Sequence, residues 1–244
     1  MSNTYFQFKQ FTIHQDKSAM KVTTDGCLFG AWVVDKMTNE AFKNNNCLDI
    51  GTGTGLLALM LAQKNPNLSI SAIEIDKDSF EQASKNIANS PWSPGIKIVH
   101  GDIKKFQSPE KFDFIISNPP FYKNELKGDK TKKNIAHHDE GLLLPELLTF
   151  IKNNLSPGGT FYLLLPFKRN EEIKNLLLEH EFDIVHMTFV SQSPNHNFFR
   201  IMLSGKLKEN KIPETVIDEI AIKDEKDNYT DAFIALLQDY YLHL

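Results

Sequence analysis

The chain has 244 residues and a formal net charge of −4. A chain of this length can bury a substantial core within one domain, and a weakly acidic chain has no overall basic coat for nucleic acid. Any nucleic acid would therefore bind to a local basic patch. The sequence contains no apolar run of about 18 residues, the length that a membrane-spanning helix needs, so we expect no contact with a membrane.

The start of the chain lacks the basic and apolar regions of a secretory signal, so we expect a cytoplasmic protein. Cys27 and Cys47 lie in apolar segments. In a reducing compartment we expect both to be small core residues, without a disulfide or a metal.

Residues 1–45 are expected to form a cap and one helix. A short N-terminal hairpin is predicted from residues at the spacing of strands, namely Phe6, Phe8, Phe11 and Ile13. Asp25 can cap the amino end of a helix that continues to residue 34.

Between residues 46 and 205, strand and helix patterns alternate, which predicts a mostly parallel sheet with helices on both faces. The predicted strands are short apolar runs at 47–50, 69–75, 96–99, 112–117 and 160–165. Helices are predicted at 56–63, from Asp78 with Glu81 completing a capping box, from Leu144 to about Ser156, and at 169–181. Strands at 184–190 and 198–203 would then form an antiparallel pair that closes the sheet.

Residues 206–244 form a charged segment with a short predicted strand at 218–222, followed by a helix that starts at Tyr229–Thr230. Apolar residues at helical spacing predict one buried stripe, made of Phe233, Leu236, Leu237, Tyr240 and Leu244. The sequence shows no internal repeat and no flexible linker, so we expect a single domain over residues 1–244.

A glycine-rich loop follows the first strand of the predicted sheet and precedes a helix. Gly51, Gly53 and Gly55 let the backbone turn tightly and approach a ligand closely. A dinucleotide fingerprint would have a third glycine at the position of Leu56. With Asp49 at the strand end, the pattern instead resembles the first motif of class I methyltransferases, and this resemblance implies S-adenosyl-L-methionine as the cofactor.

Two acidic residues follow the next strands at the same predicted edge of the sheet. Glu74 lies about 20 residues beyond the glycines, where a carboxylate can accept hydrogen bonds from two ribose hydroxyls. Asp102 follows the third strand and can accept one from the adenine amino group of the cofactor. Either residue alone would more often be a surface carboxylate, but their shared position at strand ends favours ligand binding.

Asn118, Pro119, Pro120 and Phe121 end the strand at 112–117. The Asn118 side-chain carbonyl and the Pro119 main-chain carbonyl could accept hydrogen bonds from a planar amino group and localise the lone pair of its nitrogen. The prolines stiffen the loop, so that these acceptors need little ordering when a ligand binds. Phe121 offers a ring for stacking on a base, and Tyr122 a second surface. An Asn-Pro-Pro segment by itself is more often a structural turn.

With these motifs, the chain resembles the bacterial tRNA(Val) adenine N6-methyltransferases over nearly its whole length. The resemblance also rests on residues 20–26, 48–62, 229–233 and 239–242. It implies a class I, Rossmann-like α/β fold with a seven-stranded mixed sheet, and methylation of an adenine next to the anticodon of a tRNA. Carried over by position, Lys21, Thr24 and Asp25 would line the methionine end of the cofactor site.

A lysine-rich segment directly follows the predicted catalytic loop. Residues 123–133 hold five lysines against two acids, a local excess of +3. We expect Lys130, Lys132 and Lys133 to contact tRNA phosphates. Arg200, near the closing strand pair, is a secondary candidate for substrate binding. Adjacent residues rarely converge on one ion, so His137–Asp139 is not expected to bind a metal, and we expect no metal in the protein. We expect a monomer.

Four other functions stay open at this point. The same chemistry could act on N2 of a guanine in ribosomal RNA or on a glutamine amide of release factors, and Phe121 disfavours the second. A nicotinamide-dependent oxidoreductase is disfavoured by Leu56 within the glycine motif. A non-catalytic RNA-binding module is disfavoured by the intact Asn118.

Overall fold

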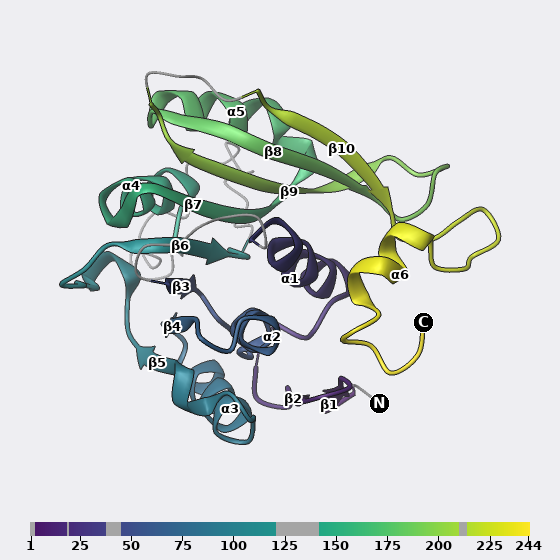
Figure 1. Cartoon of the computed structure of the whole chain (residues 1–244), viewed down its shortest axis with the longest axis horizontal. Coiled ribbons are helices and arrows are strands. Elements are labelled where there is room, and N and C mark those ends of the chain that lie inside the picture. The colour runs from purple at the N-terminus through teal and green to yellow at the C-terminus, as the bar shows by residue number, and fades with distance from the viewer. Residues whose placement is uncertain (1–2, 19, 38–44, 121–141, 210–213) are drawn as a thin grey trace, which may run out of the picture.

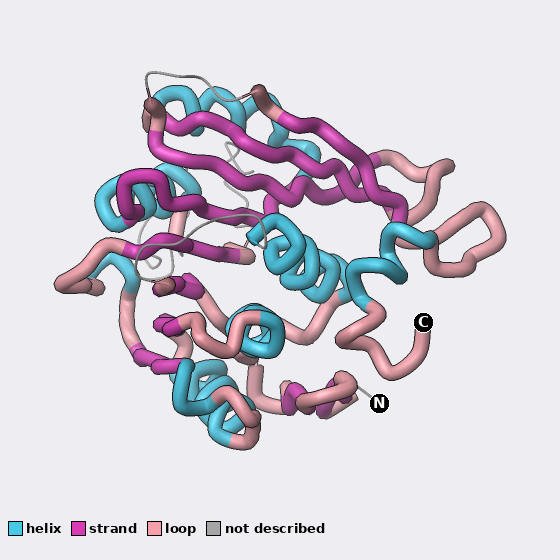
Figure 2. Tube along the Cα trace, in the orientation of Figure 1, coloured by secondary structure: helices cyan, strands magenta, loops and turns pink. Residues whose placement is uncertain are grey.

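The protein is described by a computed structural model, which covers residues 3–18, 20–37, 45–120, 142–209 and 214–244. One large twisted sheet crosses the molecule, with helices on both of its faces (Figures 1 and 2). In the described part of the chain it has eight strands in the order β10-β8-β9-β7-β6-β3-β4-β5. They are β3 (Asn46–Ile50), β4 (Ser69–Glu74), β5 (Ile96–His100), β6 (Phe112–Ser117), β7 (Leu155–Pro166), β8 (Phe182–Ser191), β9 (Phe198–Leu207) and β10 (Val216–Ala221).

β9 is antiparallel to its neighbours β7 and β8, and all other neighbouring strands are parallel. The predicted parallel sheet with a closing antiparallel pair is therefore confirmed. The expected number of seven strands was one too low. β10 pairs with the outer edge of β8 from Val216 opposite His186 to Ala221 opposite Ser191, where it satisfies backbone groups that an edge strand leaves unpaired.

The helices are α1 (Thr24–Met37), α2 (Leu56–Lys64), α3 (Lys77–Ala88), α4 (Leu144–Asn154), α5 (Asn170–Glu179) and α6 (Asp231–Leu237). Buried residues of α1, α2, α3 and α6 share one hydrophobic cluster, and those of α4 and α5 share another. Successive residues of the strands alternate between the two: in β6, Phe114 and Ile116 join the first cluster and Ile115 the second. The sheet is therefore covered on both faces, which explains its nearly continuous apolar strands.

Two predicted helix starts were wrong by one or two residues. The Thr23 hydroxyl accepts a hydrogen bond from the Gly26 amide at 3.3 Å, so Thr23 and not Asp25 caps α1. Asp76 caps α3 by accepting from the Ser79 amide at 2.8 Å, so the helix does not begin with a capping box at Asp78. The predicted helix start at Tyr229–Thr230 is confirmed: Thr230 caps α6, with its side chain accepting from the Phe233 amide.

The predicted N-terminal hairpin is confirmed as β1 (Tyr5–Gln7) and β2 (Thr12–His14), an antiparallel pair. It contacts the C-terminal segment, where the Lys9 amide donates to the Tyr240 carbonyl at 2.8 Å. In the predicted C-terminal stripe, Leu244 is 42% exposed because it lies beyond the end of α6. Cys27 and Cys47 are fully buried and free, as expected for core residues.

The chain passes from β3 outward to β4 and β5 and then returns to the other side of β3 at β6. The strand order therefore reverses between β3 and β6, where the Ile50 and Ser117 positions face each other. In open α/β sheets, ligands bind outside the carboxyl ends of the strands at such a point. The loops after Ile50 and Ser117 are those that carry the glycines and Asn118.

Candidate active site

Residues 51–55 form the loop between β3 and α2. Gly51, Gly53 and Gly55 have φ angles of +69°, +57° and +83°, a left-handed conformation that favours glycine. The amides of Gly51 and Thr52 both donate to the Ile73 carbonyl, at 2.9 and 3.1 Å, which ties the loop to β4. A Cβ atom at Gly51 would have no atom within 4 Å, so the backbone there borders open space that a ligand can approach.

Asp49 lies beneath this loop, fully buried at the end of β3. Its carboxylate accepts a hydrogen bond from the Thr52 hydroxyl at 2.6 Å, which fixes the first turn of the loop. Burial raises the pKa of Asp49 to about 7, although the Thr52 hydrogen bond opposes the rise and the nearby Glu74 carboxylate adds to it. Asp49 therefore supports the loop from below and borders neither of the cavities described next.

Two cavities meet at the carboxyl edge of the sheet. The larger has a volume of about 540 Å³ and extends from Glu74 and Asp102 to Asn118. The smaller, of about 40 Å³, extends from Asn118 along residues 20–23 to Gly26. Four residues border both cavities: Met20, Gly51, Gly53 and Asn118. An elongated ligand could therefore occupy both cavities and pass Asn118 between them.

The two predicted acidic residues border the larger cavity. Glu74 is 8% exposed, and its two oxygens accept hydrogen bonds from the amides of Gly53 at 2.8 Å and Asp76 at 2.9 Å. Each carboxylate oxygen can accept a second hydrogen bond from a ligand. Asp102 is half-buried and accepts from the Lys104 amide at 2.9 Å, at the start of a short 3-10 helix (Ile103–Lys105).

Asn118 follows β6 and lies at the meeting point of the two cavities, with Pro119 and Pro120 bordering the larger one. Its side-chain nitrogen would be 3.9 Å from a Cβ atom at Gly26, so the missing side chain of Gly26 leaves room beside the amide. Ser117, just before Asn118, is fully buried and donates its hydroxyl to the Ile50 carbonyl at 2.8 Å. This bond joins the strand before Asn118 to the strand before the glycine loop.

Lys21 borders the smaller cavity, together with Thr23 and Gly26. Thr24 and Asp25, at the start of α1, border neither cavity. Asp25 instead forms an ion pair with Arg200 of β9, with 2.7 Å between the carboxylate oxygen and Nε. The structure thus brings together two residues for which the sequence indicated separate roles.

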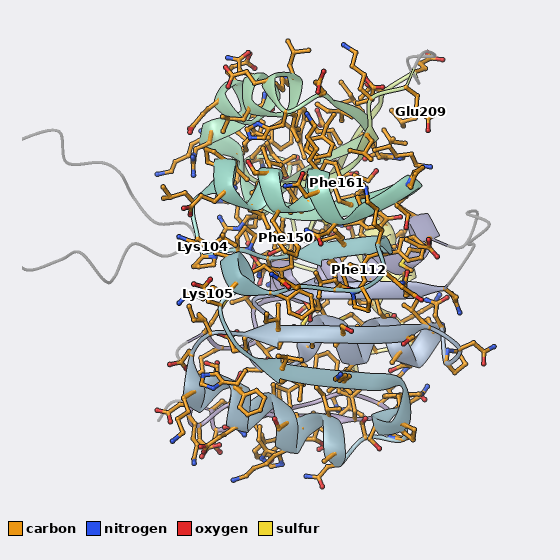
Figure 3. The ribbon with its side chains drawn as sticks, turned by 90° about the vertical axis from the view of Figure 1, so that its left-hand side faces the viewer. Lys104, Lys105, Phe112, Phe150, Phe161 and Glu209 are labelled. Atoms are coloured by element: carbon orange, nitrogen blue, oxygen red, sulfur yellow. The ribbon has the colours of Figure 1, made fainter. Side chains whose placement is uncertain are left out.

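Phe121, Tyr122, Lys130, Lys132 and Lys133 lie outside the described residues, as does His137–Asp139. In Figure 3, Lys104 and Lys105, after β5, lie toward one end of the strands, and Phe112, at the start of β6, lies toward the other end. The end of β6 and the loop with Asp102 therefore share one edge. Among the residues that the structure describes, no group of three or more His, Cys, Asp or Glu side chains could hold a metal ion. No described helix is long and apolar enough to cross a membrane.

Sequence reasoning from single residues missed Ser18, Met20 and Ser117. Ser18 and Met20 belong to a segment without helix or strand that borders the cavities. In the sequence, only the family resemblance over residues 20–26 indicated that this segment is important, and the resemblance does not say what the segment does. Ser117 has no sequence signature, because its bond to Ile50 depends on the pairing of β3 with β6.

The strand order, the glycine loop after β3 and the cavities at the carboxyl edge together define a class I methyltransferase. A family model described as "Methyltransferase small domain" matches residues 20–191. The chain is 39% identical to the tRNA1(Val) (adenine(37)-N6)-methyltransferase of Pseudoalteromonas translucida, over 98% of this chain and 99% of the relative. It is 38% identical to the enzyme of that name from Phocaeicola vulgatus, over the full length of both. The chain belongs to this family of methyltransferases.

Solved structures show the same fold at much lower sequence identity. A predicted O-methyltransferase from Agrobacterium tumefaciens has a TM-score of 0.67 at 14% identity, covering 88% of this chain and 96% of that one. The glycopeptide N-methyltransferase MtfA, complexed with S-adenosyl-L-methionine, has a TM-score of 0.54 at 14% identity, covering 74% of this chain and 93% of that one. The implied class I fold is therefore confirmed.

Proposed function

We propose that this protein transfers a methyl group from S-adenosyl-L-methionine to the exocyclic N6 amine of an adenine next to the anticodon of a tRNA, tRNA(Val). The observation that carries the proposal is the position of Asn118, which borders both cavities beside the glycine loop. The names of the relatives supply the acceptor, an adenine of tRNA1(Val).

The residues around the cavities fit the cofactor. The larger cavity suits its adenosine, with Glu74 accepting from the ribose hydroxyls and Asp102 from the adenine amino group. The smaller cavity suits the methionine arm, whose carboxylate the Lys21 ammonium complements in charge. Thr24 and Asp25 do not border the smaller cavity themselves. We assign them to this end of the site because their neighbours in sequence, Thr23 and Gly26, border it. The open space at Gly51, which a side chain would fill, supports close approach of the ligand.

Chemistry at the amine depends on the loop after β6. When bound, S-adenosyl-L-methionine supplies a methyl carbon already activated by its sulfonium, so the protein mainly positions the reacting groups. The Asn118 side-chain oxygen and the Pro119 carbonyl accept from the two N6 hydrogens, which favours a pyramidal nitrogen with a localised lone pair. Pro119 and Pro120 restrict this loop, and Phe121 and Tyr122 stack on a base that leaves the anticodon loop.

The tRNA is the proposed partner. Lys130, Lys132 and Lys133 would neutralise phosphates beside the active site. Arg200, which pairs with Asp25, is a further proposed contact. We also propose that the protein acts as a cytoplasmic monomer without a metal.

We propose that residues 1–244 form a single domain. In support, the N-terminal hairpin, α1 and α6 contribute to one hydrophobic cluster, through residues such as Phe8, Phe29 and Phe233.

Membership in a methyltransferase family argues against a nicotinamide-dependent oxidoreductase and a non-catalytic module. Nucleoside analysis separates the remaining acceptors. The protein is incubated with isotope-labelled S-adenosyl-L-methionine and unmodified total RNA, with Asn118→Ala as the control, and the RNA is digested to nucleosides. We expect labelled N6-methyladenosine from tRNA, largely absent with the variant. Label only in methylguanosine, or only in protein, would contradict the proposal.

A further inference from the structure

An irregular segment, which we call the strap (residues 15–18 and 20–23), forms one wall of the site. It contains no helix or strand in the described residues. Ser18 borders the larger cavity, residues 21–23 border the smaller one, and Met20 borders both. Any ligand that occupies both cavities therefore contacts the strap, and the position of the strap helps to define the site.

The face of α3 toward the strap is polar, although it is buried. Ser79, Gln82 and Asn86 are 5%, 4% and 2% exposed, and their spacing places them on one side of the helix. A buried helix face is ordinarily an apolar stripe. Buried polar side chains at these positions need partners, and the N-terminal segment supplies them.

Each of the three side chains contacts the segment that leads into or forms the strap. The Gln82 side-chain oxygen accepts from the Lys17 amide at 3.1 Å, and the hydroxyls of Ser79 and Ser18 are 3.3 Å apart. The Asn86 side-chain oxygen accepts from the His14 amide at 3.0 Å. At its start, the strap continues the hairpin pairing, since the Gln15 amide donates to the Thr4 carbonyl at 2.8 Å. Beyond Gln15, side chains of α3 hold it at Lys17 and Ser18.

Asn86 also reaches the cofactor loop. Its side-chain nitrogen donates to the carbonyls of His14 at 2.8 Å and Thr54 at 2.9 Å. Thr54 lies between Gly53 and Gly55. The buried side-chain amide of Asn86 thus joins α3 to the glycine loop and to His14, the last residue of β2, which directly precedes the strap.

Gln15 links the start of the strap to its end. Its side-chain oxygen accepts from the Val22 amide at 2.7 Å, and its carbonyl accepts from the Lys21 ammonium. Gln15 follows His14 directly, so a displacement of His14 would be passed through Gln15 to the residues that border the smaller cavity.

We propose that Asn86 and Gln82 are positioning residues that hold the strap against the site and thereby set the affinity for S-adenosyl-L-methionine. This inference rests on the proposed function. Neither side chain borders the cavities, so both act through the strap and, for Asn86, through the glycine loop. Because they do not approach the target amine, they should affect donor binding more than the chemical step.

The test compares Asn86→Ala and Gln82→Leu with the wild-type chain. Titration calorimetry with S-adenosylhomocysteine should give a Kd raised roughly tenfold for Asn86→Ala, which loses three hydrogen bonds, and roughly threefold for Gln82→Leu, which loses one. KM for the methyl donor should rise in the same way, while kcat at saturating donor stays within about twofold. Residue-resolved hydrogen exchange should speed up at His14 in the first variant and at Lys17 in the second.

Asn46→Ala is the matched control. The Asn46 side chain also bonds two backbone groups, accepting from the Asp113 amide at 2.8 Å and donating to the Lys111 carbonyl at 3.1 Å, but at the opposite edge of the sheet. It should lower the free energy of unfolding without changing the Kd. The inference is overturned if both strap variants keep the wild-type Kd, if kcat falls while KM is unchanged, or if Asn46→Ala raises the Kd as much. Failure of the wild-type chain to bind S-adenosylhomocysteine would instead refute the proposed function.

Discussion

At the residue scale, the chemistry depends on where Asn118 lies. Its side chain borders the cavity that suits adenosine and the cavity that suits the methionine arm, so the reacting methyl group of a cofactor spanning both would be near the amide. Ser117 and Ile50 couple this position to the glycine loop through a 2.8 Å hydrogen bond. In the proposed function, the pairing of β3 with β6 would hold the donor site and the acceptor site in one geometry.

Asn118→Ala should remove a side-chain oxygen that accepts a hydrogen bond from the target amine, and this bond should stabilise the transition state more than the bound substrate. We expect kcat for tRNA methylation to fall about 100- to 1000-fold, the usual effect of losing one preorganised polar group in an active site. The Kd for S-adenosylhomocysteine should change by less than about tenfold. Single-turnover kinetics and calorimetry measure the two effects, and a variant with wild-type kcat would remove Asn118 from the chemistry.

Asp49 makes stability depend on pH. Burial holds the pKa of Asp49 at about 7 in the folded chain, above its ordinary value of 3.8, so folding favours the neutral form. The stability that this group contributes is therefore present below pH 4 and is lost as the pH rises through 7. The size of the loss is on the order of 4 kcal/mol.

Asp49→Asn removes this titration. Relative to the wild type, the ligand-free variant should gain stability as the pH rises from about 4 to about 7 and then level off, because only the wild-type chain must bury a charge at the higher pH. Urea unfolding at several pH values measures the difference. A difference that does not change with pH would mean that Asp49 keeps an ordinary pKa.

The position of several residues at one edge of the sheet could be predicted one by one. The glycines, Glu74, Asp102 and Asn118 follow strands, and parallel strands bring their carboxyl ends to one edge. Asn86 and Ser117 could not be predicted in this way. Their partners are backbone groups distant in sequence, and a backbone carbonyl or amide leaves no mark on residue type.

At the scale of elements, a buried polar contact joins α1 to the edge of the sheet. The Trp32 indole donates to the Thr188 hydroxyl at 3.0 Å, and this hydroxyl donates to Asp218 of β10. Asp218 also contacts His186 at 2.9 Å. Thr188 is fully buried, so its hydroxyl connects α1, β8 and β10 without access to water.

Thr188→Val keeps the shape of the side chain but leaves the buried Trp32 donor unpaired. We expect the free energy of unfolding to fall by about 1–3 kcal/mol. The control is Thr149→Val, at an exposed position of α4, which should change it by less than about 0.5 kcal/mol. Chemical denaturation compares the two, and equal effects would show that the contact across the three elements has no special role.

Helix starts were the least accurate part of the prediction. Thr23 and Asp25, like Asp76 and Asp78, are all suitable capping residues one or two positions apart. The sequence alone does not decide which of two such residues caps a helix, because that depends on the path of the chain between the preceding strand and the helix. Asp25 does not cap α1, because the helix already begins at Thr24, and its carboxylate pairs instead with Arg200, distant in sequence.

At the scale of the whole molecule, the layered fold was predictable because long apolar runs alternate with amphipathic helices. The short strand predicted at 218–222 corresponds to β10, but nothing in its charged, partly exposed segment indicated that it pairs with β8 as an eighth strand of the described sheet. The strap was also not predictable as a wall of the site. It has no periodic pattern, and its position is set by polar residues of α3.

The weakly acidic chain must bind a polyanion through a local surface. Replacing Lys130, Lys132 and Lys133 with Ala should flatten the log–log salt dependence of tRNA binding by roughly two units, as expected for three lost phosphate contacts. The control replaces three exposed lysines that border neither cavity, Lys85, Lys97 and Lys111, and should leave the slope unchanged. An unchanged slope in the first variant would remove this segment from the interface.

A crystal structure of the protein soaked with S-adenosylhomocysteine tests the central claim most directly. The account predicts adenosine in the larger cavity with its ribose on Glu74, the homocysteine arm toward Lys21, and the sulfur beside the Asn118 side chain. A ligand bound elsewhere, or an Asn118 side chain that points away from the sulfur, would contradict it.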